Sequence, residues 1–116
     1  MPRYKNKLEK GMGCLLEKAG IPFTYESDRI PYAKQHHYVP DFKVGGFYIE
    51  VKGRFLPADR TKHRLIKEQH PELDIRFVFQ QPNHRLTPKS KTTYAQWCDR
   101  HGFLWSDKKL PQAWFS

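Results

Sequence analysis

Two β-rich runs separated by only two glycines constrain this chain more than any other feature of its sequence. The runs cover residues 38–44 and 47–54, and Gly45-Gly46 stands between them. The tightest β-hairpins need central residues with positive φ, which glycine adopts without steric cost. The sequence therefore predicts an antiparallel hairpin closed by a two-residue turn.

The length of this turn also sets the register of the hairpin. If Val44 pairs with Phe47, Asp41 faces Glu50 directly across the ladder. Opposed side chains have Cβ atoms about 4.5 to 5.5 Å apart, and two like charges at that distance destabilise the hairpin. We therefore expect a cation to lie between these two carboxylates.

Lys52 belongs to the same face as Glu50, because side chains alternate along a strand and Val51 points the other way. The hairpin thus presents an aspartate, a glutamate and a lysine together. Carboxylate oxygens suit Mg²⁺, which can polarise a scissile phosphate and activate water for hydrolysis. Glu50 and Lys52 alone would favour an ordinary exposed ion pair. The added Asp41 and the basic segment that follows favour a phosphodiesterase site.

The charge of the chain points to a polyanionic partner. Lys and Arg number 21 against 12 Asp and Glu, a net charge of +9, which favours binding to nucleic acid. A predicted helix over residues 58–69 follows the hairpin and is strongly basic, although a merely solvated face is the alternative. The candidate DNA-contact residues are Arg54, Arg60, Lys62, His63, Arg64 and Lys67, with Lys34, His36 and His37 ahead of the hairpin.

Hydrophobic spacing and turn signals predict the remaining elements. We expect helices over residues 6–19 and 92–101, strands over 22–30 and 73–79, a solvated connection over 33–39, and a tail from Phe103 that packs on the core. Gly11 and Gly13 lie inside the first helix, where each costs about 1 kcal/mol relative to Ala. Residues 1–116 suffice for one domain, with an α/β fold in which helices flank a small mixed sheet.

Cysteine, histidine and apolar patterns exclude several classes of protein. Cys14 and Cys98 form no CxxC pair, so we expect both to fill the core in a reducing cytoplasm. The six histidines lack zinc-ligand spacing. No signal peptide is evident, and no apolar run approaches the roughly 20 residues that cross a bilayer. The sequence predicts a soluble cytoplasmic protein without a membrane partner.

Several motifs resemble known nucleases. Pro40-Asp41 followed by Glu50-Val51-Lys52 matches the PD-(D/E)xK pattern of restriction-endonuclease-like enzymes. Leu8-Glu9, Ile30-Pro31-Tyr32, residues 38–42 and the run KEQHPELDIRFVF over residues 67–79 resemble phage endonuclease I, a family of junction-resolving enzymes of short-tailed phages. This resemblance extends from about residue 4 to Trp114.

The resemblance implies a restriction-endonuclease-like fold and an enzyme that cuts branched double-stranded DNA, above all the Holliday junction, by paired nicks. Asp41 and Glu50 match the family's metal-binding carboxylates, Lys52 its catalytic lysine and Glu9 a carboxylate on the first helix. The Val51 backbone carbonyl is a further candidate metal ligand. The expected cofactor is Mg²⁺, with Mn²⁺ able to substitute.

The resemblance also implies a homodimer in which strand exchange brings the counterpart of Glu9 from the partner subunit. Residues 33–39 could bridge the lobes of such a swapped dimer, although this connection is shorter than the family's. Thr24 stands where the family has an acidic residue, which leaves Glu26 as the nearby carboxylate.

Two other functions remain open from the sequence. The same chemistry would serve a nicking or sequence-specific endonuclease on linear duplex DNA. A non-catalytic DNA-binding module would keep the basic surface without using the carboxylates.

Overall fold

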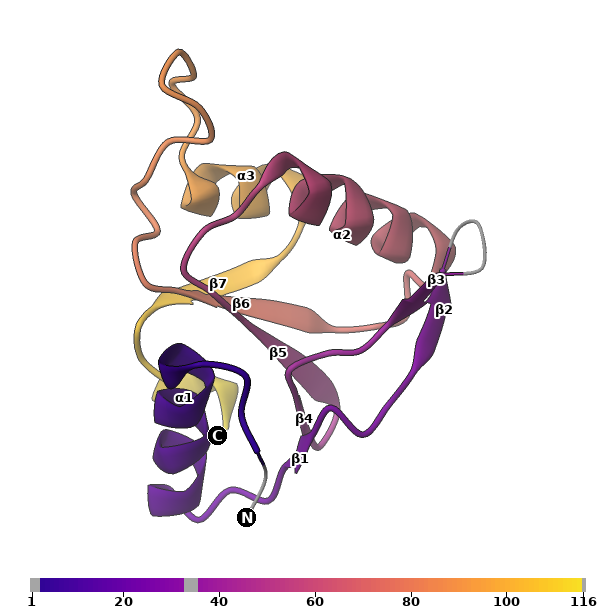
Figure 1. The fold of residues 1–116 in the computed structure, drawn as a ribbon, viewed down its shortest axis with the longest axis vertical. Helices are drawn as coiled ribbons and strands as arrows, with labels where there is room; N and C mark the ends of the chain where they lie inside the picture. Colours follow the sequence, from indigo (N-terminus) through magenta and orange to yellow (C-terminus); the bar gives the residue numbers. More distant parts are fainter. Residues whose placement is uncertain (1–2, 33–35, 116) are drawn as a thin grey trace.

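The computed structural model describes residues 3–32 and 36–115. In chain order the elements are α1 (Lys7–Lys18), β1 (Thr24–Tyr25), β2 (Ile30–Tyr32), β3 (His36–Tyr38), β4 (Phe42–Val44), β5 (Phe47–Lys52), α2 (Pro57–Gln69), β6 (Ile75–Phe79), α3 (Tyr94–His101), β7 (Leu104–Asp107) and the 3₁₀ turn η1 (Gln112–Trp114). Five strands form one sheet in the order β1-β4-β5-β6-β7, and β2 pairs with β3 in a separate ribbon (Figure 1). The expected mixed sheet with flanking helices is confirmed.

The hairpin forms in the predicted register. Val44 pairs with Phe47, and the antiparallel ladder ends with Phe42 opposite Ile49. Gly45 has φ of +51°, a left-handed conformation that glycine adopts without strain. Asp41 therefore lies one residue beyond the last ladder pair, on the side of the hairpin where Glu50 continues β5.

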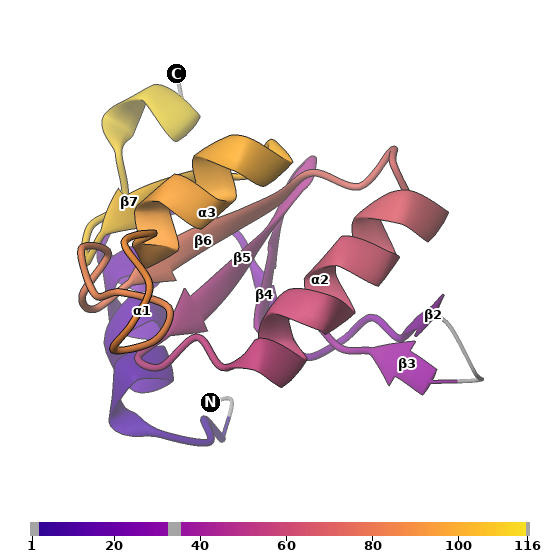
Figure 2. The same cartoon turned by 90° about the horizontal axis from the view of Figure 1, so that it is seen from above.

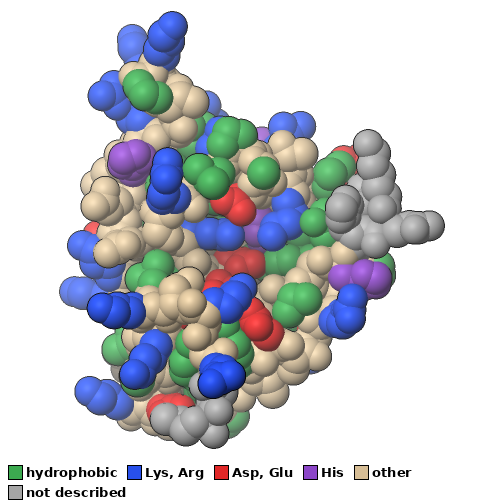
Figure 3. Space-filling model, viewed as in Figure 1, with side chains coloured by type: hydrophobic (Ala, Val, Ile, Leu, Met, Phe, Trp, Pro, Cys, Tyr) green, Lys and Arg blue, Asp and Glu red, His purple; other side chains and the backbone are tan. Residues whose placement is uncertain are grey.

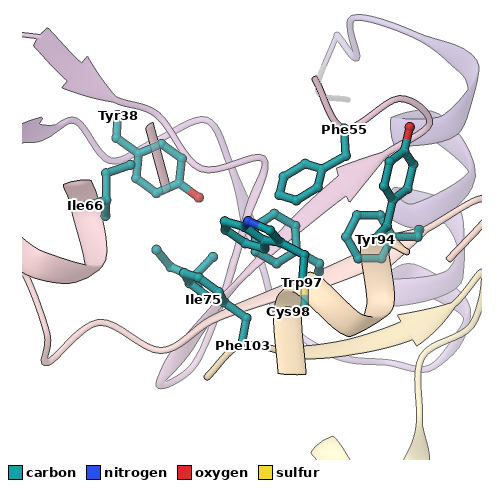
Figure 4. Close-up of a cluster of buried hydrophobic side chains, with 10 residues drawn as sticks. Tyr38, Phe55, Ile66, Ile75, Tyr94, Trp97, Cys98 and Phe103 are labelled. Atoms are coloured by element: carbon teal, nitrogen blue, oxygen red, sulfur yellow. The ribbon is translucent and has the colours of Figure 1, made fainter. Parts of the chain in front are cut away.

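Helices cover both faces of the sheet. One core packs α2 and α3 against residues such as Phe77 and Phe79, and it includes Tyr38, Trp97 and Phe103 (Figure 4). The other core packs α1 against alternate residues of β4 and β5. Figures 1 and 2 show α2 and α3 lying together, away from α1. The alternation of β5 thus points Val51 to the α1 side, where it is buried as expected.

The predicted strand over residues 22–30 is wrong in extent. It divides into β1, in the main sheet, and β2, in the ribbon, with Glu26 between them at φ of +47°. Pro31 lies inside β2 and pairs with His37. Proline lacks a donor for a second neighbouring strand, so a two-stranded ribbon accommodates it where the main sheet would not.

Residues His36–Tyr38 also differ from expectation, because they form β3 where the sequence predicted a solvated connection. Tyr38 is buried at 1% exposure, since the ribbon folds its ring onto α2. The pairing partner lies on β2, and the polar His36-His37 pair carries no strand signal of its own. Residues 33–35, including Lys34, lie outside the described part of the chain.

The tail contributes a strand that the sequence analysis did not predict. β7 adds to the edge of the sheet parallel to β6, with Phe77 opposite Trp105. Trp114 then packs near Phe47, with ring centroids 6.1 Å apart. Packing of the tail on the core is thus confirmed, and part of it occurs through backbone pairing.

The helix limits follow their caps. The Asn6 side chain accepts from the Glu9 N–H at 2.8 Å, and Gly102 ends α3 at φ of +76°. Cys98 is buried as expected, whereas the expectation for Cys14 is wrong because its place on α1 faces solvent. Among the described residues, no helix is long and apolar enough to cross a membrane.

Candidate active site

Asp41 and Glu50 are both buried where the hairpin ladder ends. Their exposed fractions are 5% and 3%. Oδ2 of Asp41 accepts a hydrogen bond of 2.9 Å from the backbone N–H of Val51. If the ladder continued, a backbone carbonyl of the neighbouring strand would accept this N–H. The Asp41 side chain accepts it instead. This bond fixes the aspartate beside the strand that carries Glu50 and Lys52.

Asp41 belongs to a cluster of three carboxylates. Ligand atoms of Glu9, Glu26 and Asp41 all lie within 4.8 Å of one another. The Lys5 ammonium lies among them, 2.8 Å from Glu26, 3.6 Å from Glu9 and 3.8 Å from Asp41. Lys5 is thus the cation beside Asp41, but it joins Asp41 to Glu9 and Glu26, whereas the sequence predicted a cation between Asp41 and Glu50.

The first helix delivers Glu9 into this cluster. The Tyr25 hydroxyl donates to Oε1 of Glu9, and the Lys5 backbone N–H donates to the same oxygen at 3.2 Å. The Glu9 side chain is thus turned toward β1, and the N-cap is completed by Asn6 alone. The carboxylates of the cluster therefore come from α1, from the end of the hairpin and from the segment that follows β1.

Burial and the closeness of the carboxylates to one another shift their pKa values. Burial and the negative charge of Glu50 raise the pKa of Asp41 to about 9. Burial opposes ionisation of Glu9 as well, but hydrogen bonds from Tyr25 and Asp41 and the charge of Lys5 hold its pKa below the ordinary value. At neutral pH, Asp41 therefore keeps a proton that it shares with its neighbours. A divalent cation would replace this proton, and an all-oxygen donor set fits Mg²⁺.

Lys52 is held by a partner on α2. Its ammonium lies 3.2 Å from Oδ1 of Asp59, whose other oxygen accepts from the Leu56 N–H at 3.0 Å. Burial opposes the charge of Lys52, but Glu50 and Asp59 outweigh burial and raise its pKa. The lysine is therefore a fixed cation directed to the face that carries Glu50.

The predicted DNA-contact residues divide by exposure. Arg54 and Arg64 are exposed, and Lys62 is partly exposed above the Tyr38 ring, with 5.6 Å between its Nζ and the ring centroid. Figure 3 shows one face of the molecule, with Asp and Glu side chains near its middle and Lys and Arg side chains around them. A polyanion approaching this face would meet cations before it reached the carboxylates.

Other members of that set have protein partners. Arg60 donates to the Phe55 carbonyl at 2.7 Å, and Lys67 donates to the Gly102 carbonyl at 3.0 Å. The expectation that His63 shares the exposed basic face is wrong, because its side chain is completely buried. His37 is exposed on β3, the side chain of His36 is not described, and Lys34 lies outside the described residues.

Lys5, Tyr25 and Asp59 were missed by the sequence analysis. Tyr25 reaches the cluster because β1 pairs beside β4, and the backbone of Lys5 donates to the Tyr25 hydroxyl, so both depend on contacts between segments distant in sequence. Asp59 follows Pro57 and suggests only an ordinary first-turn acid of a helix. Glu26 was noted as the carboxylate nearest the altered family position, and the structure places it in the cluster.

A family model for phage endonuclease I matches residues 1–116 of the sequence. The chain belongs to the phage endonuclease I family. Endodeoxyribonuclease 1 of Enterobacteria phage T3 is 46% identical over 114 residues, which cover 95% of this chain and 75% of that protein. Endonuclease I of Escherichia phage T7 is 43% identical over 115 residues, which cover 96% of this chain and 77% of that protein. Membership of the phage endonuclease I family confirms the resemblance found in the sequence and the assignment to nucleases.

Proposed function

We propose that this member of the phage endonuclease I family resolves four-way DNA junctions by Mg²⁺-dependent hydrolysis, with Mn²⁺ able to replace Mg²⁺. The observation that carries the proposal is the cluster of Glu9, Glu26 and Asp41 where the hairpin ladder ends, with Glu50 and Lys52 of β5 interacting with Asp41, on a face rich in cations. Such a site can bind a phosphodiester backbone and the divalent ion that activates it.

Each residue has a distinct role in this proposal. Asp41, Glu50 and Glu9 would hold the metal, together with the Val51 carbonyl. The bound metal supplies polarisation of the phosphate and activation of water. Lys52, kept charged and oriented by Asp59, would hold a phosphate oxygen and offset negative charge that develops during cleavage.

The cationic surface of the protein would recognise the shape of the DNA branch. Arg54, Lys62 and Arg64, which are exposed or partly exposed, would contact DNA phosphates. Phosphate contacts position DNA without specifying its sequence, which agrees with recognition of a branch. A nickase acting on linear duplex would use the same chemistry, so substrate preference separates the two candidates.

Paired nicks require two sites, which a two-fold homodimer would supply. In this chain Glu9 reaches Asp41 within one subunit. Domain swapping reuses intrachain contacts, so exchange of α1 between subunits would preserve the same contacts between the two chains. The connection over residues 33–39 would then bridge the two lobes. The expected setting is the cytoplasm of an infected host cell.

The decisive experiment compares cleavage of a labelled four-way junction and a linear duplex of the same arm sequence, in Mg²⁺ or chelator. Glu50→Gln should abolish cutting but retain junction binding, whereas Glu68→Gln on the exposed side of α2 should behave as wild type. Equal cutting of both substrates would favour the nickase. Junction binding without cutting by the wild type would leave a DNA-binding module.

A further inference from the structure

His63 lies on the buried side of α2, although Lys62 and Arg64 on either side of it are cations. Its side chain is 0% exposed. The rings of Tyr38, Phe77 and Phe103 pack edge-on around it, with centroid distances of 5.2, 4.8 and 6.3 Å. These three contacts fix the plane of the imidazole, so its ring nitrogens point in defined directions.

One of these nitrogens faces the active site. Nε2 of His63 lies 3.8 Å from Oε1 of Glu50, which is itself buried. Within the described part of the chain, neither Nδ1 nor Nε2 has a hydrogen-bond partner. Buried polar groups in native proteins almost always have such a partner. A completely buried imidazole aimed at a carboxylate of the site therefore points to a role there.

The chemistry of the contact selects one tautomer. A neutral imidazole carries a single N–H, on either Nε2 or Nδ1. A proton on Nε2 would be donated toward the Glu50 carboxylate. A proton on Nδ1 would instead lack an acceptor and would leave the Nε2 lone pair facing the carboxylate oxygen. The Nε2–H form is therefore favoured.

We propose that His63 is a positioning residue whose Nε2–H orients the Glu50 carboxylate for metal binding. The proposal rests on the proposed function, because it takes Glu50 as a metal ligand. Hydrogen-bond partners of ligating side chains typically change metal affinity or activity by about 10- to 100-fold when substituted. The contact is longer than a hydrogen bond, as catalytic contacts often are before the substrate complex forms.

The first test measures Mn²⁺ affinity of the DNA-free protein by calorimetry for wild type, His63→Leu and His63→Gln. Leucine fills the pocket without a donor, whereas glutamine restores an N–H. We expect about 10- to 100-fold weaker binding for His63→Leu and recovery to within a few-fold for His63→Gln. Unchanged affinity in His63→Leu would overturn the proposal. Equal weakness of both variants would also overturn it, because shape alone would then matter.

A double-mutant cycle then asks whether His63 acts through Glu50. His63→Leu should cause little further loss in a Glu50→Gln background, since the carboxylate to be oriented is gone. A full additive loss would show that His63 acts elsewhere. Circular dichroism and thermal melting of every variant verify that the compared proteins are folded.

The tautomer provides a measurement on the unmodified chain. Long-range ¹H–¹⁵N correlation spectra of ¹⁵N-histidine-labelled protein, with the His63 signals assigned by their loss in His63→Gln, should show Nε2–H. An Nδ1–H tautomer would overturn the proposal, including in the case that His63→Leu fails to fold. A wild-type protein that binds Mn²⁺ but cuts no junction would reject the proposed function, while the Mn²⁺ affinities would still decide the role of His63.

Discussion

The backbone N–H of Val51 donates to Oδ2 of Asp41 across 2.9 Å, in the place where the next hydrogen bond of the hairpin ladder would have formed. This bond holds a buried aspartate beside Glu50 and Glu9, although their charges oppose its ionisation. The hydrogen bond thus fixes the position of Asp41, while the charges around it disfavour its ionised form. The pH dependence of the protein's stability should reflect this opposition.

The contribution of Asp41 to the stability of the DNA-free protein should fall as pH rises from about 4 toward 9. The pKa of Asp41 is raised from 3.8 to about 9 in the folded state, so over this range the folded protein binds a proton that the unfolded chain has released. Asp41→Asn removes this effect and keeps an oxygen for Val51. The variant should therefore be stabilised relative to wild type more at pH 8 than at pH 5, as measured by denaturant unfolding without divalent ions. An equal difference at both pH values would contradict the raised pKa.

Replacement of Lys5 should strengthen metal binding. Its ammonium contacts Glu9, Glu26 and Asp41, so it competes with any cation that enters the cluster. The lysine is more than half exposed, and such ion pairs contribute about 1 kcal/mol or less. Lys5→Gln should therefore raise Mn²⁺ affinity by up to about fivefold.

The matched control for this change is Lys18→Gln, in the last turn of α1 and exposed. Calorimetric titration with Mn²⁺ should give it the affinity of the wild type. Weaker Mn²⁺ binding by Lys5→Gln would instead mean that Lys5 organises the carboxylates for the metal.

Asp59→Asn should slow cleavage without weakening junction binding. The substitution keeps an acceptor for the Leu56 N–H but removes the charge that holds Lys52. Displacement of a catalytic group by about 1 Å can cost about 100-fold, so a loss of about tenfold or more is expected. Single-turnover cleavage and gel-shift binding in chelator separate the two effects. A variant that binds DNA poorly but cuts at the normal rate would place Asp59 in DNA binding.

The two glycines inside α1 should respond differently to alanine. A Cβ at Gly11 would meet nothing within 4 Å, so Gly11→Ala should raise the free energy of unfolding by about 1 kcal/mol through helix propensity. A Cβ at Gly13 would lie only 2.2 Å from the Tyr4 hydroxyl oxygen, so Tyr4 must move. Gly13→Ala should therefore lose this gain or destabilise the protein. Thermal or urea unfolding of both variants tests the difference, and equal gains would show that Tyr4 gives way freely.

Removal of exposed cations should reduce the salt dependence of junction binding. Each phosphate contact contributes about 0.9 to the slope of log affinity against log salt concentration for duplex DNA. Arg54→Ala and Arg64→Ala should each lower the magnitude of the slope by about this amount, whereas Lys18→Ala should leave it unchanged. Binding measured in chelator over a range of salt concentrations gives the slopes. Unchanged slopes for both arginine variants would place the DNA on another face.

The sequence by itself determined the local framework of the protein and most of the proposed site. A two-glycine turn set the hairpin register, so strand alternation could place Glu50 and Lys52 on one face and Val51 on the other. Caps and hydrophobic spacing located the three α-helices to within about two residues. These features are local, because turns, caps and periodicity depend on residues that are close in the chain.

Only the tertiary structure decided which of these elements meet. Pairing of β1 with β4 brings Tyr25 and Glu26 to Asp41. β7 joins the sheet through backbone hydrogen bonds, which the side-chain pattern of the tail did not predict. Because His63 stands among basic residues in the sequence, it was predicted to contact DNA. In the structure it is buried against Phe77 instead. Periodicity predicts the face of an element on which a side chain lies. Which segment packs on that face depends on contacts between residues distant in the sequence, and such packing places His63 beside Glu50.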